Sequence, residues 1–462
     1  MNVQRSPIPT RLKLTAALAA ACALASGCAT RDRPRLSVLL IVVDSMRADH
    51  LGAYGYGRPT SPRLDAMARG GIAFTHATSQ APWTRPSVAS LFTSTYISVH
   101  RVLFSMRVVD GQERSDALNE NFLTLAEAMS AGGFATGGFG MKQHLNPEFG
   151  FGQGFDGYDM QLGRAEKINR RTLDWLRRAD PERFFIYLHY NDPHYPYTPR
   201  PGFDSFGVAK PRVQINGATR KAFREGNLPL FPEDARDLVD LYDAEIRYTD
   251  HHIGKLVDTI TARGYSNLLI VVTADHGEEF LEHGDITHGH SLYSELLHVP
   301  LIVSGSALPA DSRGARRDTQ VQVIDIMPTL LDLAGLPAPP GIQGVTFAGA
   351  LSAGAASASG AAAFSERLEP EEPGFSETIV EGRWKLIRDL AGGRTMLFDL
   401  SADPGEQVRI EADRQEMVTR LLAQLDTWRE ANRALHDKIR PEETAPLDPE
   451  IREKLRSLGY IQ

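Results

Sequence analysis

Three apolar runs, each followed by polar side chains, constrain the fold of this chain more than any other feature. Residues 36–43 (LSVLLIVV) are rich in β-branched side chains and end directly before Asp44. Residues 184–190 and 267–273 have the same character. Continuous apolar runs of this kind are typical of parallel strands that are buried on both faces of a sheet. We therefore expect the core to be built around a parallel sheet.

Helical patterns lie between these runs. Residues 123–129, 168–178 and 236–263 repeat apolar side chains at helical spacing, and shorter strand candidates occur at residues 71–74 and 134–139. Strands that alternate with helices predict an α/β fold, in which helices cover both faces of a mostly parallel central sheet. In such sheets the ligand binds at the carboxyl ends of the strands.

Acidic side chains follow each of the three main predicted strands. Asp44 follows the first strand, Asp192 the second and the pair Asp275-His276 the third. The carboxyl ends of parallel strands lie at one edge of the sheet, so these side chains are expected to converge. Carboxylate oxygens and an imidazole nitrogen are suitable ligands for a divalent metal ion.

The stretch from Ala81 to Ser94 contains the candidate nucleophile, Thr84. Pro86 suits the first position of a helix, because its missing N–H is one that a helix start leaves unpaired. Thr84 would then lie just outside the helix, where free N–H groups and the positive dipole end favour an anion. The alternative is that Thr84 only begins the helix, a position at which Ser and Thr are common.

Composition excludes several classes of protein. The 462 residues carry a formal net charge of −8 and a pI near 6.0, which gives no reason to expect nucleic-acid binding. Cys22 and Cys28 are the two cysteines of the sequence, and both lie near its start. The folded body is therefore expected to have no disulfide, no thiolate metal site and no cysteine nucleophile.

The first 27 residues have the features of a bacterial lipoprotein leader. Basic residues precede an apolar run over residues 14–25, and small residues lead to Cys28. The junction resembles a lipobox, which implies lipidation of Cys28 and anchoring to a membrane of the bacterial cell envelope. Ala29 after the cysteine indicates the outer membrane or periplasm of a Gram-negative host. An ordinary cleaved signal peptide is the alternative.

The C-terminal part of the chain differs in composition from the rest. Residues 351–375 include many Ala, Gly and Ser residues, and this composition predicts a linker or insertion. Residues 377–388 and 395–400 favour two strands of a smaller sheet, and residues 414–431 an amphipathic helix. We expect a catalytic domain over residues 28–350 and a small subdomain over residues 376–462.

The side chains that suit metal-assisted chemistry on phosphate or sulfate esters fall into two groups. The metal candidates are Asp44, Asp275 and His276 together with Thr84. The candidates for contacts to the non-bridging oxygens are Lys142, His144, His194, and His288 or His290; His283 and Asp285 share the last loop and have weaker claims.

These motifs, taken in order, resemble the sulfatase family of the alkaline phosphatase-like superfamily over nearly the whole chain after the leader. The matching segments are residues 41–55 around Asp44, 84–87 with 91–93, 142–145, 189–197, 242–246, 273–278 and 288–293, followed by 384–387 and 397–404 in the C-terminal part. The resemblance implies an alkaline phosphatase-like α/β/α sandwich with a small C-terminal antiparallel sheet.

The sequence departs from the family pattern at three positions. Sulfatases use a cysteine or serine that is oxidised to formylglycine, whereas this chain has Thr84, which cannot give an aldehyde. The family arginine is replaced by Val88, and one of two paired acids is replaced by Ser45. Thr84 instead resembles the nucleophile of phosphoethanolamine transferases and of lipoteichoic acid synthase. With His276 in place of an asparagine, the set favours Zn²⁺ or Mn²⁺ over Ca²⁺.

We therefore expect a hydrolase with one divalent metal, which cleaves a sulfate, phosphate or phosphonate ester of a small molecule, glycan or lipid through a Thr84 ester. His288 or His290 would protonate the leaving group. A second ion held by Asp192, His194, His288 and His290 is an alternative. Two further alternatives are a transferase that acts on an envelope glycan or lipid and a catalytically silent binding lipoprotein on the same fold.

Overall fold

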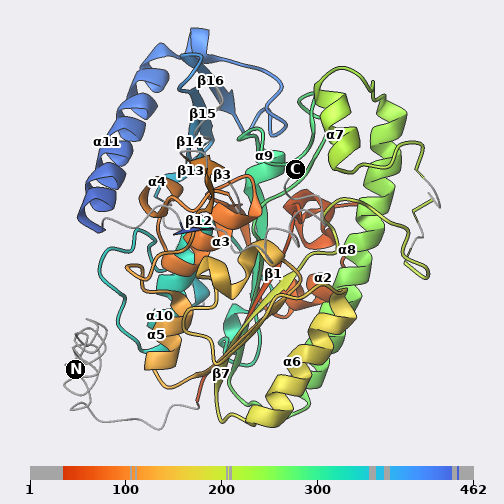
Figure 1. Ribbon diagram of the computed structural model, residues 1–462, viewed down its shortest axis with the longest axis vertical. Coiled ribbons are helices and arrows are strands. Elements are labelled where there is room, and N and C mark those ends of the chain that lie inside the picture. Colours follow the sequence, from red (N-terminus) through yellow and green to blue (C-terminus); the bar gives the residue numbers. More distant parts are fainter. Residues whose placement is uncertain are drawn as a thin grey trace, which may run out of the picture.

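The computed structural model describes residues 35–104, 107–109, 112–203, 206–207, 211–352, 361–368, 375–439 and 445–446. The predicted leader and the predicted lipidation site, Cys28, lie outside these residues. Figure 1 shows a large sheet in the middle of the molecule, with helices on both sides, and a smaller sheet beside the C-terminal helix α11.

The large sheet has eight strands in the order β12-β2-β11-β8-β1-β7-β5-β6. Its strands are β1 (Ser37–Val43), β2 (Ile72–Thr78), β5 (Ala135–Gly140), β6 (Gly157–Asp159), β7 (Phe184–Tyr190), β8 (Leu268–Ala274), β11 (His298–Ser304) and β12 (Ala315–Gln322). Within this sheet β11 runs antiparallel to both of its neighbours, and the other pairs are parallel. The predicted mostly parallel α/β sheet is confirmed.

Helices cover both faces of this sheet. One face carries α2 (Pro62–Arg69), α6 (Ala165–Ala179) and α8 (Pro232–Thr261), and the other carries α3 (Thr84–Thr93), α5 (Leu125–Ala131) and α10 (Ile326–Ala334). The residues of β1, β7 and β8 are all buried, as expected for strands that are covered on both faces. Within the described part of the chain, no helix is both long enough and apolar enough to span a bilayer.

The smaller sheet is antiparallel and has the order β13-β14-β15-β16. It comprises β13 (Ala363–Arg367), β14 (Ser376–Glu381), β15 (Trp384–Asp389) and β16 (Arg394–Asp399), and it packs against α11 (Gln415–Ile439). The expectation of two strands here was incomplete. Residues 377–388 form two strands with a turn at Gly382, and part of the predicted linker, Ala363–Arg367, is a strand of this sheet.

The remaining elements are short. They are α4 (Ile97–His100), α7 (Gly217–Arg224), α9 (Ser294–Leu297), β3 (Arg107–Val109), β4 (Gln112–Ser115), β9 (Glu279–Phe280), β10 (Ile286–Thr287) and β17 (Ala445–Pro446). Among them α7 is important for the site, because it lies in the long connection between β7 and α8. Its N-terminus is fixed by a capping box between Asn216 and Thr219.

Candidate active site

Two carboxylates meet at the carboxyl edge of the large sheet. β1 and β8 are parallel neighbours in which Val43 pairs with Ala274, so the next residues, Asp44 and Asp275, emerge side by side. Both carboxylates are buried. The backbone N–H of Ser45 donates to Asp275 Oδ1 at 3.2 Å and thereby links the two strand ends. The convergence predicted for these two residues is present.

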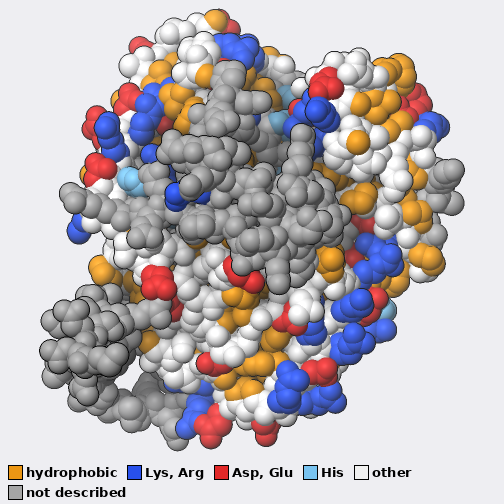
Figure 2. Space-filling model, in the orientation of Figure 1, with side chains coloured by type: hydrophobic (Ala, Val, Ile, Leu, Met, Phe, Trp, Pro, Cys, Tyr) orange, Lys and Arg blue, Asp and Glu red, His pale blue; other side chains and the backbone are white. Residues whose placement is uncertain are grey.

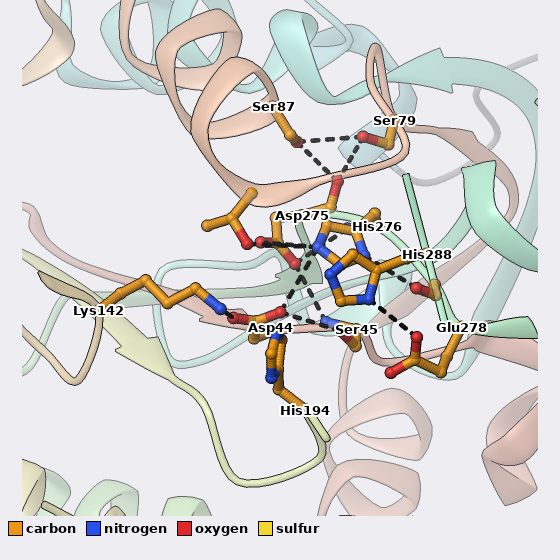
Figure 3. A network of polar contacts seen from close by, with 12 residues as sticks. Asp44, Ser45, Ser79, Ser87, Lys142, His194, Asp275, His276, Glu278 and His288 are labelled. Carbon is orange, nitrogen blue, oxygen red and sulfur yellow. Dashed lines mark hydrogen bonds and ion pairs between the residues drawn. The ribbon is translucent and has the colours of Figure 1, made fainter. Parts of the chain in front are cut away.

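Thr84 reaches the same place from α3. The helix begins at Thr84 itself, so Pro86 is its third residue and not the first, as the sequence had suggested. The Ser87 hydroxyl donates to the carbonyl oxygen of Asp275 at 2.6 Å, and the Ser79 hydroxyl donates to that same oxygen (Figure 3). These bonds hold the start of α3 against the end of β8.

His276 lies between the carboxylates and Thr84. Its Nδ1 lies 2.8 Å from the carbonyl oxygen of Gly277, an acceptor that requires the proton to be on Nδ1. The lone pair of Nε2 therefore faces Asp44 Oδ1 and Asp275 Oδ2, each 3.5 Å away, and Thr84 Oγ1, which is 3.3 Å away. The four residues predicted to bind a metal thus surround one small space.

A second imidazole, His189, borders this space and was missed by sequence reasoning. It is the second-last residue of β7, fully buried, and its Nε2 lies 3.5 Å from Asp44 Oδ2 and 3.9 Å from Asp275 Oδ2. The Tyr187 hydroxyl lies 2.7 Å from its Nδ1. A single histidine in an apolar strand usually belongs to the core, and only the pairing of β7 with β1 brings it next to Asp44.

These side chains fit a divalent cation. Ligand atoms of Asp44, His189 and Asp275 lie within 4.8 Å of one another. His189 Nε2 and Asp275 Oδ2 are buried and make no hydrogen bond to any described residue, which is costly unless a further group binds there. A set of two carboxylates and two imidazoles suits Zn²⁺ or Mn²⁺ better than Ca²⁺.

Lys142 follows β5 and contributes a buried positive charge. Its Nζ donates to Asp44 Oδ2. Burial alone would raise the pKa of the Asp44 carboxyl, but the charge of Lys142 holds that pKa well below its usual value. Asp44 is therefore a carboxylate at neutral pH, as a metal ligand must be.

Three predicted histidines surround a cavity of about 270 Å³ that opens from Thr84. Burial lowers the pKa of His194 to about 3, with Lys142 acting in the same direction, and it lowers the pKa of His144 and His288 as well. All three are neutral at pH 7 without an anion. An anionic ligand would offset the positive surroundings and raise these pKa values.

His288 is oriented by an acid that sequence reasoning did not assign. Its Nδ1 lies 2.8 Å from Oε1 of Glu278, which is buried two residues after His276. Burial raises the pKa of the Glu278 carboxyl well above its usual value. The other nitrogen of His288, Nε2, is thereby left for contacts on the side of the ring that faces His276 and His194 (Figure 3).

Arg85 is a further cation that the sequence did not single out. Its guanidinium donates to the backbone carbonyl oxygens of His144, at 2.5 Å, and Asp116, and it lies over the Phe149 ring. Burial lowers its pKa to about 10, so it stays charged at neutral pH. Val88, at the family's arginine position, is buried, whereas Arg85 lines the cavity.

Several predicted residues lie elsewhere. His290 is not part of the described cavity lining, and its ring nitrogens contact Arg224 at 2.9 Å and Glu279 at 2.6 Å. Asp192 is also outside: its carboxylate accepts the N–H of Ala165 at 3.0 Å and pairs with Arg200 at 3.1 Å. A second metal site that includes Asp192 and His290 is therefore not assembled.

The two weaker candidates of the same loop also lie outside this cavity lining. His283 Nδ1 lies 2.6 Å from Glu295, and Asp285 pairs with Arg224 at 3.1 Å. Their contacts hold the loop in place, and His288 is the histidine of this loop that lines the cavity.

Fold and site together define a hydrolase of the alkaline phosphatase type, and sequence comparison gives the family. The sulfatase family model matches residues 37–336, and a model described as N-sulphoglucosamine sulphohydrolase, C-terminal, matches residues 282–431. The chain belongs to the sulfatase family, whose members are metal-dependent hydrolases.

Individual relatives are distant but cover most of the chain. A Δ4,5-hexuronate-2-O-sulfatase of Bacteroides thetaiotaomicron is 24% identical over 84% of this chain and 87% of its own length. Among solved structures, a 2-O GAG sulfatase matches with a TM-score of 0.72 and 21% identity, covering 90% of this chain and 96% of the other. The phosphonate monoester hydrolase of Agrobacterium radiobacter matches with a TM-score of 0.68 and 22% identity, covering 87% and 96%.

Proposed function

We propose that this protein hydrolyses phosphate, phosphonate or sulfate esters with Thr84 as its nucleophile. One observation carries the proposal: Thr84 Oγ1 lies 3.3 Å from His276 Nε2, beside two buried carboxylates, at the base of a cavity. Among the described residues that line this cavity none is acidic, and Arg85, Lys142 and three histidines are present. An anionic group would be stabilised there next to the hydroxyl.

The first step is an in-line attack. Thr84 loses its hydroxyl proton to solvent, its Oγ1 forms a bond to phosphorus or sulfur, and the bond to the leaving oxygen breaks. His288, oriented by Glu278, is the proposed proton donor to that oxygen. Water then cleaves the Thr84 ester. A divalent ion held by Asp44, Asp275 and His276, when bound, would lower the pKa of the Thr84 hydroxyl.

The remaining groups stabilise the charge of the transition state. Lys142, His144 and His194 face the cavity next to Thr84. Lys142 can donate hydrogen bonds to the non-bridging oxygens, and the two histidines can do so once a bound anion has raised their pKa values and they are protonated. Thr84 is also the first residue of α3, where the free N–H groups and the helix dipole favour negative charge. The nucleophile and its oxyanion donors are therefore on one side of the cavity.

Threonine favours phosphorus over sulfur as the target. The resemblance to sulfatases implies an aldehyde hydrate as nucleophile, and Thr84 cannot supply one. The similar structures include a phosphonate monoester hydrolase as well as sulfatases, so the fold is compatible with both chemistries. A transferase of the same architecture would pass the group from Thr84 to an alcohol, and the analysis of products distinguishes the two.

The test is a panel of aryl sulfates, phosphate monoesters, phosphate diesters and phosphonates, run with defined divalent metals. On the best ester, Thr84→Ala is expected to lower kcat by about 10⁴-fold or more, as for other lost nucleophiles. Thr84→Ser should retain part of the rate, and a Thr84 adduct should be trapped by rapid quenching and mass spectrometry. Equal rates for wild type and a folded Thr84→Ala protein would show that Thr84 is not the nucleophile.

A further inference from the structure

Arg220 is a cation at the cavity that the mechanism above does not use. It lies on α7, in the long connection between β7 and α8, and it lines the same cavity as Thr84 and Lys142. Figure 2 shows Lys and Arg side chains on the side of α7 that faces the middle of the molecule. The Arg220 side chain is half-buried, so the residues packed around it hold it at the cavity.

The position of α7 is fixed by the second arginine of the same helix face. Arg224 is four residues after Arg220, so the two side chains lie on one face. Arg224 Nε donates to Asp285 Oδ1 at 3.1 Å, and its Nη2 lies 2.9 Å from His290 Nδ1. His290 is in turn held by Glu279 at 2.6 Å. Arg224 therefore docks α7 onto the loop that carries His288, and its charge is offset by Asp285.

The charge of Arg220 is not offset in this way. Among the residues that the structure describes, Arg220 forms no ion pair with a carboxylate, and its guanidinium carbon lies 5.6 Å from the centre of the Tyr195 ring. Tyr195 stacks on His194, with ring centres 4.5 Å apart, so the ring places Arg220 next to the catalytic histidines. A guanidinium held over an aromatic ring keeps its planar fork of donors available for an anion.

The remaining wall of the cavity is apolar. Trp83 and Phe104 are stacked with ring centres 6.4 Å apart, and Leu103 lies beside them. The cavity thus offers one set of donors for the scissile group and a flat apolar wall for the alcohol portion. Two further cations line it, Arg224, whose charge is offset by Asp285, and Arg220. Its volume, about 270 Å³, is at the small end of ligand pockets.

We propose that Arg220 binds a second anionic group of the substrate, a carboxylate, phosphate or sulfate carried by the alcohol portion of the ester. This inference rests on the proposed function, because it assumes that the scissile group lies at Thr84. It narrows the substrates to compact esters with two negative groups, and it makes Arg220 a specificity residue.

The test compares two esters that differ only in the second charge: 3-carboxyphenyl and 3-carbamoylphenyl esters of the acid that the panel identifies. Wild type is expected to favour the carboxylate by about tenfold or more in kcat/KM, mainly through KM, as for a charged hydrogen bond lost. Arg220→Gln should bring the kcat/KM ratio of the two esters close to one. Lys221→Gln is the matched control, because Lys221 is exposed on the same helix and does not line the cavity.

Binding measurements keep the test informative if no ester is turned over. The corresponding 3-carboxyphenyl and 3-carbamoylphenyl phosphonates have a P–C bond in place of the ester, and calorimetry on wild type and Arg220→Gln gives their relative affinities. A preference for the carboxylate that Arg220→Gln removes and Lys221→Gln retains supports the proposal. Equal affinities in wild type, or a preference that survives Arg220→Gln, would overturn it without bearing on Thr84.

Discussion

Two buried lysine–carboxylate pairs, one at the active site and one in the C-terminal subdomain, have the same chemistry and different surroundings. The side chains of Lys142 and Asp44 are 2% and 0% exposed, and those of Lys385 and Glu406 are 1% and 0% exposed. Lys385 lies at a distance of 2.7 Å from Glu406 and also donates to the Ser294 hydroxyl at 3.2 Å. Burial of the charges therefore does not distinguish the two pairs.

Their neighbours do distinguish them. Glu406 also accepts the backbone N–H of Ser294 at 2.5 Å, so the second pair joins β15 and the loop after β16 to α9. Around Asp44, by contrast, His189 Nε2 and Asp275 Oδ2 make no hydrogen bond to a described residue. Lys385 even lines the larger cavity, about 820 Å³ against about 270 Å³ at Thr84. The second pair also contains a buried oxygen without a hydrogen bond, Glu406 Oε1, but this atom is ion-paired with Lys385. Ligand atoms gathered around one point, and not cavity size, therefore distinguish the pair at Asp44.

Of the two lysines, the one at the active site should have the larger effect on turnover when it is removed. Lys142→Gln is expected to lower kcat by about 10²–10³-fold, the usual cost of one donor to transition-state oxygens. Steady-state kinetics on the best ester, together with circular dichroism to check folding, measure the effect. Activity within threefold of wild type would place Lys142 in the same structural role as Lys385.

The other lysine should affect stability and not turnover. Lys385→Met leaves Glu406 buried without its partner, so the free energy of unfolding should fall by about 3–5 kcal/mol while the activity of the folded fraction is retained. Urea denaturation measures this. The double variant Lys385→Met/Glu406→Gln should regain much of the loss, because no unpaired charge remains. A loss of turnover in the folded single variant would contradict the structural role.

A measurement of metal affinity shows whether His189 is a metal ligand or a residue of the core. If His189 contributes to the cation site, His189→Gln should weaken metal binding by about tenfold or more, by analogy with changes close to a metal. Competition with a chelator measures the affinity without any activity assay. His100→Gln is the matched control, since it removes a buried imidazole that contacts Ser90 and does not belong to the candidate cation site. Unchanged affinity in His189→Gln would leave it as a packing residue.

A third buried pair, Arg200 with Glu245, predicts a pH effect on stability. Burial raises the pKa of Glu245 from 4.5 to about 8, despite Arg200 at 3.2 Å. Between these values the unfolded chain has lost the proton that the folded protein keeps, so stability should fall as pH rises through this range. Glu245→Gln should reduce that fall by roughly 2 kcal/mol, measured by urea unfolding at pH 5 and pH 8. A pH dependence identical to that of wild type would mean that Glu245 is ionised when folded.

The convergence of Asp44, Asp275 and His276 could be predicted because it depends on local patterns and one rule of sheet geometry. Asp44 and Asp275-His276 follow apolar runs that could be recognised as strands, and strand ends meet at one edge. The rule was wrong at Asp192, which also follows a strand but contacts Arg200 and the start of α6. Whether a residue that follows a strand reaches the site depends on the order of the strands in the sheet, here β7 beside β1. No local sequence pattern contains that order.

Other parts of the site could not be predicted for the same reason. His189 becomes a candidate ligand through its register with Val42 of β1, and a single-strand pattern contains no register. The exposed helix α7 has no buried residues, so no apolar stripe marked it, although its capping box was a possible indicator. The antiparallel strand β11 was also missed. Pro300 interrupts its apolar run, and a proline within a run argues against an interior strand.

The hydroxyls of Ser79 and Ser87 have a consequence for the speed of any reaction at Thr84. Both donate to the same backbone oxygen of Asp275, so the first turn of α3 and the end of β8 move as one body. The spacing between the threonine oxygen and the carboxylate is therefore established during folding. Little entropy remains to be lost when the ester arrives, and binding energy can be spent on the transition state instead.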